Sequence, residues 1–127
     1  MNERSRLGRE GEQEAIYHLM LRGYTLLEHN WRSSHYEIDI IAEYWGQIVF
    51  VEVKTRRNGD YIDPDTIVSY AQQQRLRRAA THYLARNRLT DRSFRFDLIT
   101  LEGDAPPFVL HHYRNVFHTT PPNYPLP

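Results

Sequence analysis

The feature that most limits what this chain can fold into is the segment 37–54, which reads EIDIIAEYWGQIVFVEVK. It predicts two antiparallel β-strands joined by a turn at Trp45-Gly46, and the second strand contains the apolar run 48–51. A strand that is apolar on both faces is normally central in its sheet. Each strand nevertheless carries carboxylates, and these are costly to bury unless something compensates their charge.

The ionisable residues of this hairpin suit a metal site. Side chains alternate between the faces of a strand, so Glu52 and Lys54 face the same way, as do Glu37 and Asp39 on the other strand. Asp39 and Glu52 can hold Mg²⁺ between them, because this cation takes oxygen ligands, and the carbonyl of Val53 is a candidate third ligand. A bound metal polarises a phosphate and lowers the pKa of a bound water, and an ammonium group stabilises phosphoryl charge. The residues therefore suit phosphodiester hydrolysis.

Composition limits the class of protein. The chain has 127 residues, enough for one domain with a real core. It contains no cysteine, which excludes disulfides and thiolate metal sites and fits a reducing cytoplasm. No apolar run reaches the roughly 20 residues of a membrane span, and the polar N-terminus has no apolar region typical of a signal peptide. We expect one domain at 1–118, a proline-rich tail at 119–127, a cytoplasmic location and no membrane contact.

Charge is unevenly distributed, although the formal net charge is zero. Residues 1–53 hold five Arg and nine acidic residues, whereas residues 54–95 hold ten basic and four acidic residues. Lys54 is the single lysine beside fifteen arginines. The middle of the chain could face phosphates, and the first third could supply acidic ligands. A set of solvated helix faces explains the same distribution equally well, and zero net charge argues mildly against a protein that simply coats nucleic acid.

The first helix brings a further carboxylate. Residues 5–22 show the apolar spacing of a helix, and Glu12 lies on the apolar face. Gly8 and Gly11 lie on or near that face; each costs about 1 kcal/mol relative to Ala, which suggests close approach to another backbone. If this helix packs across the end of the sheet, Glu12 is a further metal ligand or orients a water. The alternative is a carboxylate that reaches solvent or favours the N-terminal half of the helix.

The remaining elements follow from periodicity and turn chemistry. Ser69 with Gln72 matches a capping box and predicts the start of a second helix. A strand, helix and strand in succession predict a right-handed crossover with parallel strands. The expected helices cover 5–22 and 70–87, and the expected strands cover 24–32, 47–54, 95–101 and 108–113, besides the one that begins near Glu37.

These motifs resemble known proteins. The order αβββαβ with D-(x)n-E-x-K resembles the restriction-endonuclease-like PD-(D/E)XK nuclease fold. More specifically, the chain resembles the uncharacterised YraN-like bacterial proteins from residue 8 to about 101. That family usually has Gly at the position of Tyr36 and Lys at the position of Gln72. The matching motifs are Gly11-Glu12 with Ala15, EIDIIA at 37–42, FVEVKTR at 50–56, Arg75-Leu76 with Ala79-Ala80 and Tyr83-Leu84, and Arg95-Phe96-Asp97.

The resemblance implies a fold and an active site. The fold is α/β, a restriction-endonuclease-like three-layer core with a mixed β-sheet flanked by helices in the order αβββαββ. The family in turn resembles archaeal Holliday-junction resolvases, which use a helix Glu, a strand Asp and an E-x-K motif. Those roles fall here on Glu12, Asp39, Glu52 and Lys54, with Mg²⁺ or Mn²⁺ on Asp39, Glu52 and Val53. Junction resolvases act as dimers on a two-fold symmetric substrate, so the resemblance is compatible with a homodimer, which no residue of this chain demonstrates.

The expected function is a metal-dependent endonuclease that acts on DNA phosphodiesters, for example in branched or damaged DNA. Arg56, Arg57 and Arg75 are candidate phosphate contacts. The alternative is a non-catalytic nucleic-acid-binding or protein-interaction module on the same fold, which the zero net charge and Gln72 support. A third interpretation is a structural partner in which the acidic cluster is a satisfied polar network.

Overall fold

A computed structural model describes residues 3–60, 63 and 67–117; the expected tail at 119–127 lies outside this part of the chain. The elements follow the predicted order αβββαββ, with boundaries within two residues of expectation. In the described part, neither helix is both long and apolar enough to cross a membrane. The elements are α1 (Glu3–Leu21), β1 (Thr25–Ser33), β2 (Tyr36–Tyr44), β3 (Gln47–Arg56), α2 (Tyr70–Arg86), β4 (Phe94–Glu102) and β5 (Val109–Tyr113).

The strands form one mixed sheet in the order β1-β2-β3-β4-β5. β3 and β4 are parallel, with Ile48 opposite Phe94 and Arg56 opposite Glu102, and α2 connects them. The other neighbouring strands are antiparallel. The predicted hairpin and the predicted parallel crossover are therefore both confirmed.

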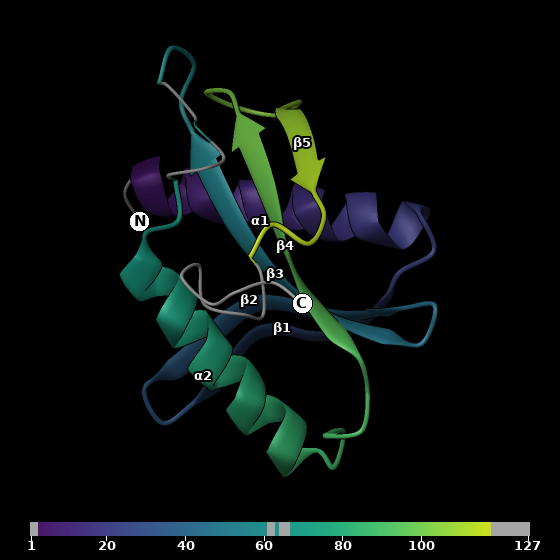
Figure 1. The fold of residues 1–127 in the computed structure, drawn as a ribbon. Coiled ribbons are helices and arrows are strands. Elements are labelled where there is room, and N and C mark those ends of the chain that lie inside the picture. The colour runs from purple at the N-terminus through teal and green to yellow at the C-terminus, as the bar shows by residue number, and fades with distance from the viewer. Residues whose placement is uncertain (1–2, 61–62, 64–66, 118–127) are drawn as a thin grey trace.

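The sheet separates two apolar cores (Figure 1). On one face, α2 packs with Leu76 and Tyr83 near Phe50 of β3. On the other face, α1 packs with Ala15 and Leu19. β3 is covered on both faces, so its run 48–51 is fully buried, as an apolar central strand requires. The result is a three-layer α/β arrangement of helix, sheet and helix.

Two local sequence signals produce the expected geometry. The Ser69 side chain accepts a hydrogen bond from the Gln72 backbone N–H, and the Gln72 side chain accepts one from the Ser69 N–H, each at 3.2 Å. This is the capping box at the start of α2. Trp45 and Gly46 have φ of 51° and 78°, as the tight turns that suit twisted hairpins require.

Gly11 allows α1 to pack closely on β3. A Cβ atom at Gly11 would lie 2.0 Å from Oγ1 of Thr55, so no side chain fits there without displacement. The close neighbour is a side chain rather than the predicted backbone. The same prediction is wrong for Gly8, where a Cβ would meet nothing within 4 Å. The close contact at Gly11 places Glu12 at the end of the sheet where the ionisable residues of β2 and β3 lie.

Candidate functional site

The site lies where β2 and β3 separate. Their pairing runs from Tyr44 opposite Gln47 to Ile40 opposite Val51. Beyond that point β2 stays with β1, whereas β3 continues beside β4, and the two pairs of strands diverge in Figure 1. The next residues toward the divergence are Asp39 on β2 and Glu52 on β3. We call this place the strand fork.

The Asp39 side chain replaces a backbone contact at the strand fork. Its Oδ2 accepts a hydrogen bond of 2.9 Å from the backbone N–H of Val53. In an extended strand, the N–H and C=O of one residue point toward the same edge, so the Val53 carbonyl also faces the Asp39 side. The fork therefore presents a backbone carbonyl oxygen beside the two carboxylates.

Glu52 and Lys54 lie together on β3, as the alternation of side chains predicts. Lys54 Nζ is 3.7 Å from Glu52 Oε1, and their side chains are 16% and 18% exposed. The pKa of Glu52 is raised to about 8, chiefly by burial and then by the negative charge of Asp39, while the Lys54 ammonium opposes both effects. Burial also raises the pKa of Asp39, although the Val53 N–H favours its charged form. One ammonium therefore does not compensate the ionised forms of both carboxylates.

Glu12 reaches the edge of this group from α1. Its Oε2 lies 3.4 Å from Nε2 of His29 on β1, and its side chain is 21% exposed. Burial raises the pKa of Glu12, and the charge of Asp39 adds to the effect, whereas hydrogen bonding to His29 opposes it. The structure therefore places Glu12 within electrostatic reach of Asp39 and gives it a histidine partner that the sequence did not reveal.

The donor atoms at the strand fork fit a hard divalent cation. In the described part of the chain, no group of three or more His, Cys, Asp or Glu side chains is arranged to hold a metal ion by itself. The donors available are the carboxylates of Asp39 and Glu52 and the carbonyl of Val53. Mg²⁺ commonly takes one or two carboxylates and keeps several waters for exchange with substrate phosphate, so this smaller set suffices. A cation here would also offset the charge that burial makes unfavourable.

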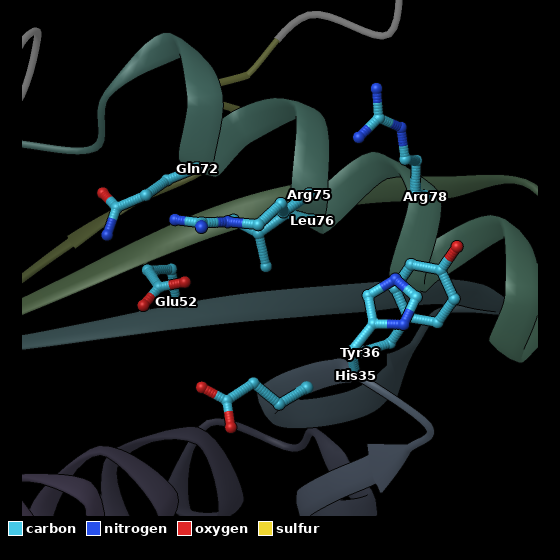
Figure 2. A pocket seen from close by; sticks show the side chains of 8 residues that line it. His35, Tyr36, Glu52, Gln72, Arg75, Leu76 and Arg78 are labelled. Atoms are coloured by element: carbon cyan, nitrogen blue, oxygen red, sulfur yellow. The ribbon is translucent and has the colours of Figure 1, made fainter.

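Two cavities flank the strand fork, one on each side of β3. The first, between α2 and the β1–β2 turn, has a volume of about 400 Å³ and includes Glu52 in its lining. Figure 2 shows Gln72 and Arg75 of α2 extending over Glu52. The second, between α1, β3 and the loop after β3, has a volume of about 820 Å³ and includes Glu12 and Lys54. We call them the α2 cavity and the α1 cavity.

The three arginines predicted to contact phosphate all line these cavities. Arg75 lines the α2 cavity, and Arg56 and Arg57 line the α1 cavity. No carboxylate of residues 3–60, 63 and 67–117 forms an ion pair with any of the three. Among the described residues, no carboxylate partner therefore neutralises the charge of these three arginines.

The α2 cavity also contains residues that the sequence did not identify as part of a site. The lining includes His35 of the β1–β2 turn, Tyr36 at the start of β2 and Arg78 of α2. Arg78 lies one helical turn from Arg75, a spacing visible in the sequence. No local signal connects the turn with α2, because only the packing of β2 beneath α2 brings them together.

A second polar network lies on the α1 side of the sheet. Asp97 of β4 is fully buried and accepts hydrogen bonds from Arg95 at 2.9 and 3.1 Å, from Nε2 of His112 at 2.8 Å and from the N–H of Asn115 at 2.9 Å. His112 also contacts His18 of α1 at 3.1 Å, and Arg95 donates to the Tyr24 hydroxyl at 2.7 Å. Every Asp97 contact is internal, so this network is a structural connection between α1, β4 and β5.

Comparison with known proteins places the chain in a family. The model of the uncharacterised protein family UPF0102 matches residues 11–101. A UPF0102 protein of Phocaeicola vulgatus is 37% identical over 93% of this chain and 97% of its own length. One from Alkaliphilus oremlandii is 40% identical over 88% and 97%, and one from Alkaliphilus metalliredigens is 48% identical over 72% and 81%. These matches support the resemblance to YraN-like proteins, and the chain belongs to family UPF0102.

Proposed function

We propose that this protein is a metal-dependent endonuclease that acts on DNA phosphodiesters. The observation that carries the proposal is the meeting of Asp39, Glu52 and Lys54 at the strand fork, beside a backbone carbonyl and between two cavities lined by arginines. Oxygen donors, one ammonium group and nearby cations are the groups that phosphodiester hydrolysis needs. The assignment of the three-layer fold to the restriction-endonuclease-like class is part of the same proposal.

Each residue has a distinct role in the proposed reaction. A divalent cation held by Asp39, Glu52 and the Val53 carbonyl would polarise the phosphate and lower the pKa of a bound water. The Lys54 ammonium, 3.7 Å from Glu52, stabilises negative charge on the phosphoryl oxygens. Glu12, near Asp39 and paired with His29, orients the attacking water.

Arginines around the fork hold the substrate. Arg56 and Arg57 in the α1 cavity and Arg75 in the α2 cavity contact phosphates on the two sides of the reacting group. Phosphate contacts position a strand without reading its sequence, so we expect cleavage to depend on DNA structure more than on base sequence.

The test is cleavage of purified DNA substrates. The protein is incubated with flap, junction and single-stranded DNA in Mg²⁺ or Mn²⁺, beside Glu52→Ala and a Trp45→Ala control. Trp45 is 89% exposed at the β2–β3 turn and lies outside both cavities. We expect the wild type and Trp45→Ala to cut and Glu52→Ala to be inactive. Cleavage that survives Glu52→Ala removes the proposal, because the activity then belongs to a contaminant.

A non-catalytic nucleic-acid-binding or interaction module is the second candidate. It is favoured by the zero net charge and by the small number of acidic donors at the fork within the described residues. Gln72, at a position where the family usually has Lys, also favours it. Titration of labelled DNA across salt concentrations separates the two candidates. Binding that weakens steeply with salt, without metal-dependent cleavage, favours the second.

A further inference from the structure

The α2 cavity has two chemically different ends. Glu52 lies at one end, and His35 and Tyr36 lie at the other, as Figure 2 shows. Leu76 of α2 contributes an apolar surface to its wall. A cavity of about 400 Å³ is within the range of small-ligand sites, so it can take a group the size of one nucleotide.

The far end of the cavity is formed by ring side chains that pack against one another at tilted angles. The Tyr36 ring lies 4.3 Å from that of His35 and 5.3 Å from that of His82 on α2, with interplanar angles of 35° and 33°. His82 is itself held by a 3.0 Å hydrogen bond to the Ser33 hydroxyl. His35 is exposed, whereas Tyr36 is half-buried. Packing against α2 therefore fixes the position of Tyr36, and a flat ring system remains beside the cavity.

Two arginines of α2 line the cavity, Arg75 over Glu52 and Arg78 above the aromatic end, as Figure 2 shows. Arg75 and Arg78 are both exposed and lie three positions apart on the helix. In the part of the chain that the structure describes, neither forms an ion pair with a carboxylate. Cations beside an aromatic stack are the combination that binds single-stranded nucleic acid, because the cations hold the backbone and the rings stack on a base.

The α1 cavity has a different lining. Lys54, Arg56 and Arg57 give it positive charge, and no aromatic ring is among the described residues that line it. It can hold backbone phosphates but offers a base no ring to stack on. The two sides of β3 are therefore unequal, and a strand crossing the fork meets an aromatic site on one side alone.

We infer that the α2 cavity holds the base of an unpaired nucleotide next to the phosphate at the strand fork, with His35 and Tyr36 as the stacking surface. This inference rests on the proposed nuclease function and adds the substrate class. A base inside a duplex is stacked on its neighbours and cannot offer its face to a protein ring without leaving the helix. The preferred substrates are therefore DNA molecules with single-stranded nucleotides at the cleavage position, such as flaps and gaps.

The first test measures binding without divalent metal, so it does not depend on cleavage. The probes are a flap DNA with 2-aminopurine in its single-stranded arm and a blunt duplex of the same sequence. We expect tighter binding of the flap and quenching of its fluorescence. The double variant His35→Ala/Tyr36→Leu should lower flap affinity about tenfold to hundredfold and leave duplex affinity unchanged. Tyr36→Phe, which keeps the ring, and Trp45→Ala, outside the cavity, should both bind like the wild type.

Salt dependence separates stacking from phosphate contacts. Arg75→Ala and Arg78→Ala should each weaken binding and lower the slope of log affinity against log salt by about one, whereas His35→Ala/Tyr36→Leu should leave that slope unchanged. Far-UV circular dichroism of each variant shows whether it is folded. If the double variant is not folded, His35→Ala alone, at an exposed residue, carries the test and should still lower flap affinity. Loss of ring stacking as the cause is supported only when the phenylalanine variant retains full affinity.

The outcomes distinguish this inference from the proposed function. Equal binding of flap and duplex, or full flap preference in the double variant, overturns the inference even if the protein cuts DNA. Flap preference that depends on the two rings, without metal-dependent cleavage, supports the base site and overturns the hydrolytic function. Flap-selective cleavage that is lost in the double variant and in Glu52→Ala supports both.

Discussion

The carboxylate of Glu52 has one cation, Lys54, within ion-pair distance in the described structure, and it shares its surroundings with Asp39. Burial raises its pKa, so the folded protein disfavours the charged form. An apolar or amide side chain at this position would avoid the cost of burying a charged carboxylate. Glu52 is therefore better explained by a role in function than by a role in stability.

Replacing Glu52 with Gln tests that interpretation. The amide has nearly the same shape and no charge to desolvate, so in metal-free buffer at neutral pH we expect the free energy of unfolding to stay equal or to rise by about 1 kcal/mol. Metal-dependent cleavage should be lost. Urea unfolding and the DNA cleavage assay measure the two effects; a loss of several kcal/mol would show that Glu52 is a structural residue.

Asp97 presents the opposite case. Burial alone would raise its pKa, but hydrogen bonds from His112, Arg95 and the Asn115 N–H together outweigh it, and the pKa is lowered. All these partners are donors, so this carboxylate is matched to its surroundings. It therefore contributes to stability rather than to chemistry at the fork.

Asp97→Asn should destabilise the protein by about 3–5 kcal/mol, because the new amide N–H₂ meets a donor and leaves the Arg95 charge unpaired. A lowered folded-state pKa means that the contribution of Asp97 is present above its ordinary pKa and is lost as pH falls below that value. The stability difference from wild type should accordingly shrink in acid. Urea unfolding at neutral pH and at about pH 3 checks both points. A difference that stays constant with pH would contradict this account.

At the scale of elements, the contact between α1 and β3 sets the position of Glu12. Gly11 is buried against Thr55, and the neighbouring residues of both elements, Glu12 and Lys54, belong to the candidate site. The closeness of the two elements depends on the absence of a side chain at one position.

Gly11→Ala should destabilise the protein by about 1–3 kcal/mol, because overpacking against Thr55 outweighs the better helix propensity of Ala. The same substitution at Gly8, where a Cβ meets nothing within 4 Å, is the matched control and should stabilise by up to about 1 kcal/mol. Thermal unfolding compares the two. Adding Thr55→Ala to Gly11→Ala should recover part of the loss, since the closest clashing atom is Oγ1.

At the scale of the whole molecule, the site depends on β2, β3 and the layers on both faces of the sheet. Asp39 and Glu52 come from different strands, so their alignment exists only in the folded state. A cation that needs both carboxylates must therefore bind the folded protein in preference to the unfolded chain.

Mg²⁺ or Mn²⁺ should consequently raise the melting temperature. The free energy of unfolding should increase by about 2.7 kcal/mol when the free-ion concentration is 100 times the Kd. Asp39→Asn and Glu52→Gln should lose this shift. Glu43→Gln is the control. Glu43 lies on β2, as Asp39 does, but its carboxylate pairs with Arg92 instead of facing the fork. Differential scanning fluorimetry with and without the ion measures the shifts, and a shift retained in Asp39→Asn would place the ion elsewhere.

The sequence by itself determined the elements and their order. Periodicity identified α1, α2 and the strands, the turn at Trp45-Gly46 identified the hairpin, and the succession of strand, helix and strand identified the parallel pair. These are local or short-range patterns, in which neighbouring residues carry the information. Alternation along β3 also placed Glu52 and Lys54 together, because both lie on the same strand.

Only the tertiary structure decided what surrounds the site. The separation of β2 from β3 at Asp39, the histidine partner of Glu12 and the aromatic end of the α2 cavity each join segments distant in sequence. The buried network around Asp97 likewise joins α1, β4 and β5. Such contacts depend on how whole elements pack and twist against one another, and no periodic pattern along the chain records which side chains will then face each other.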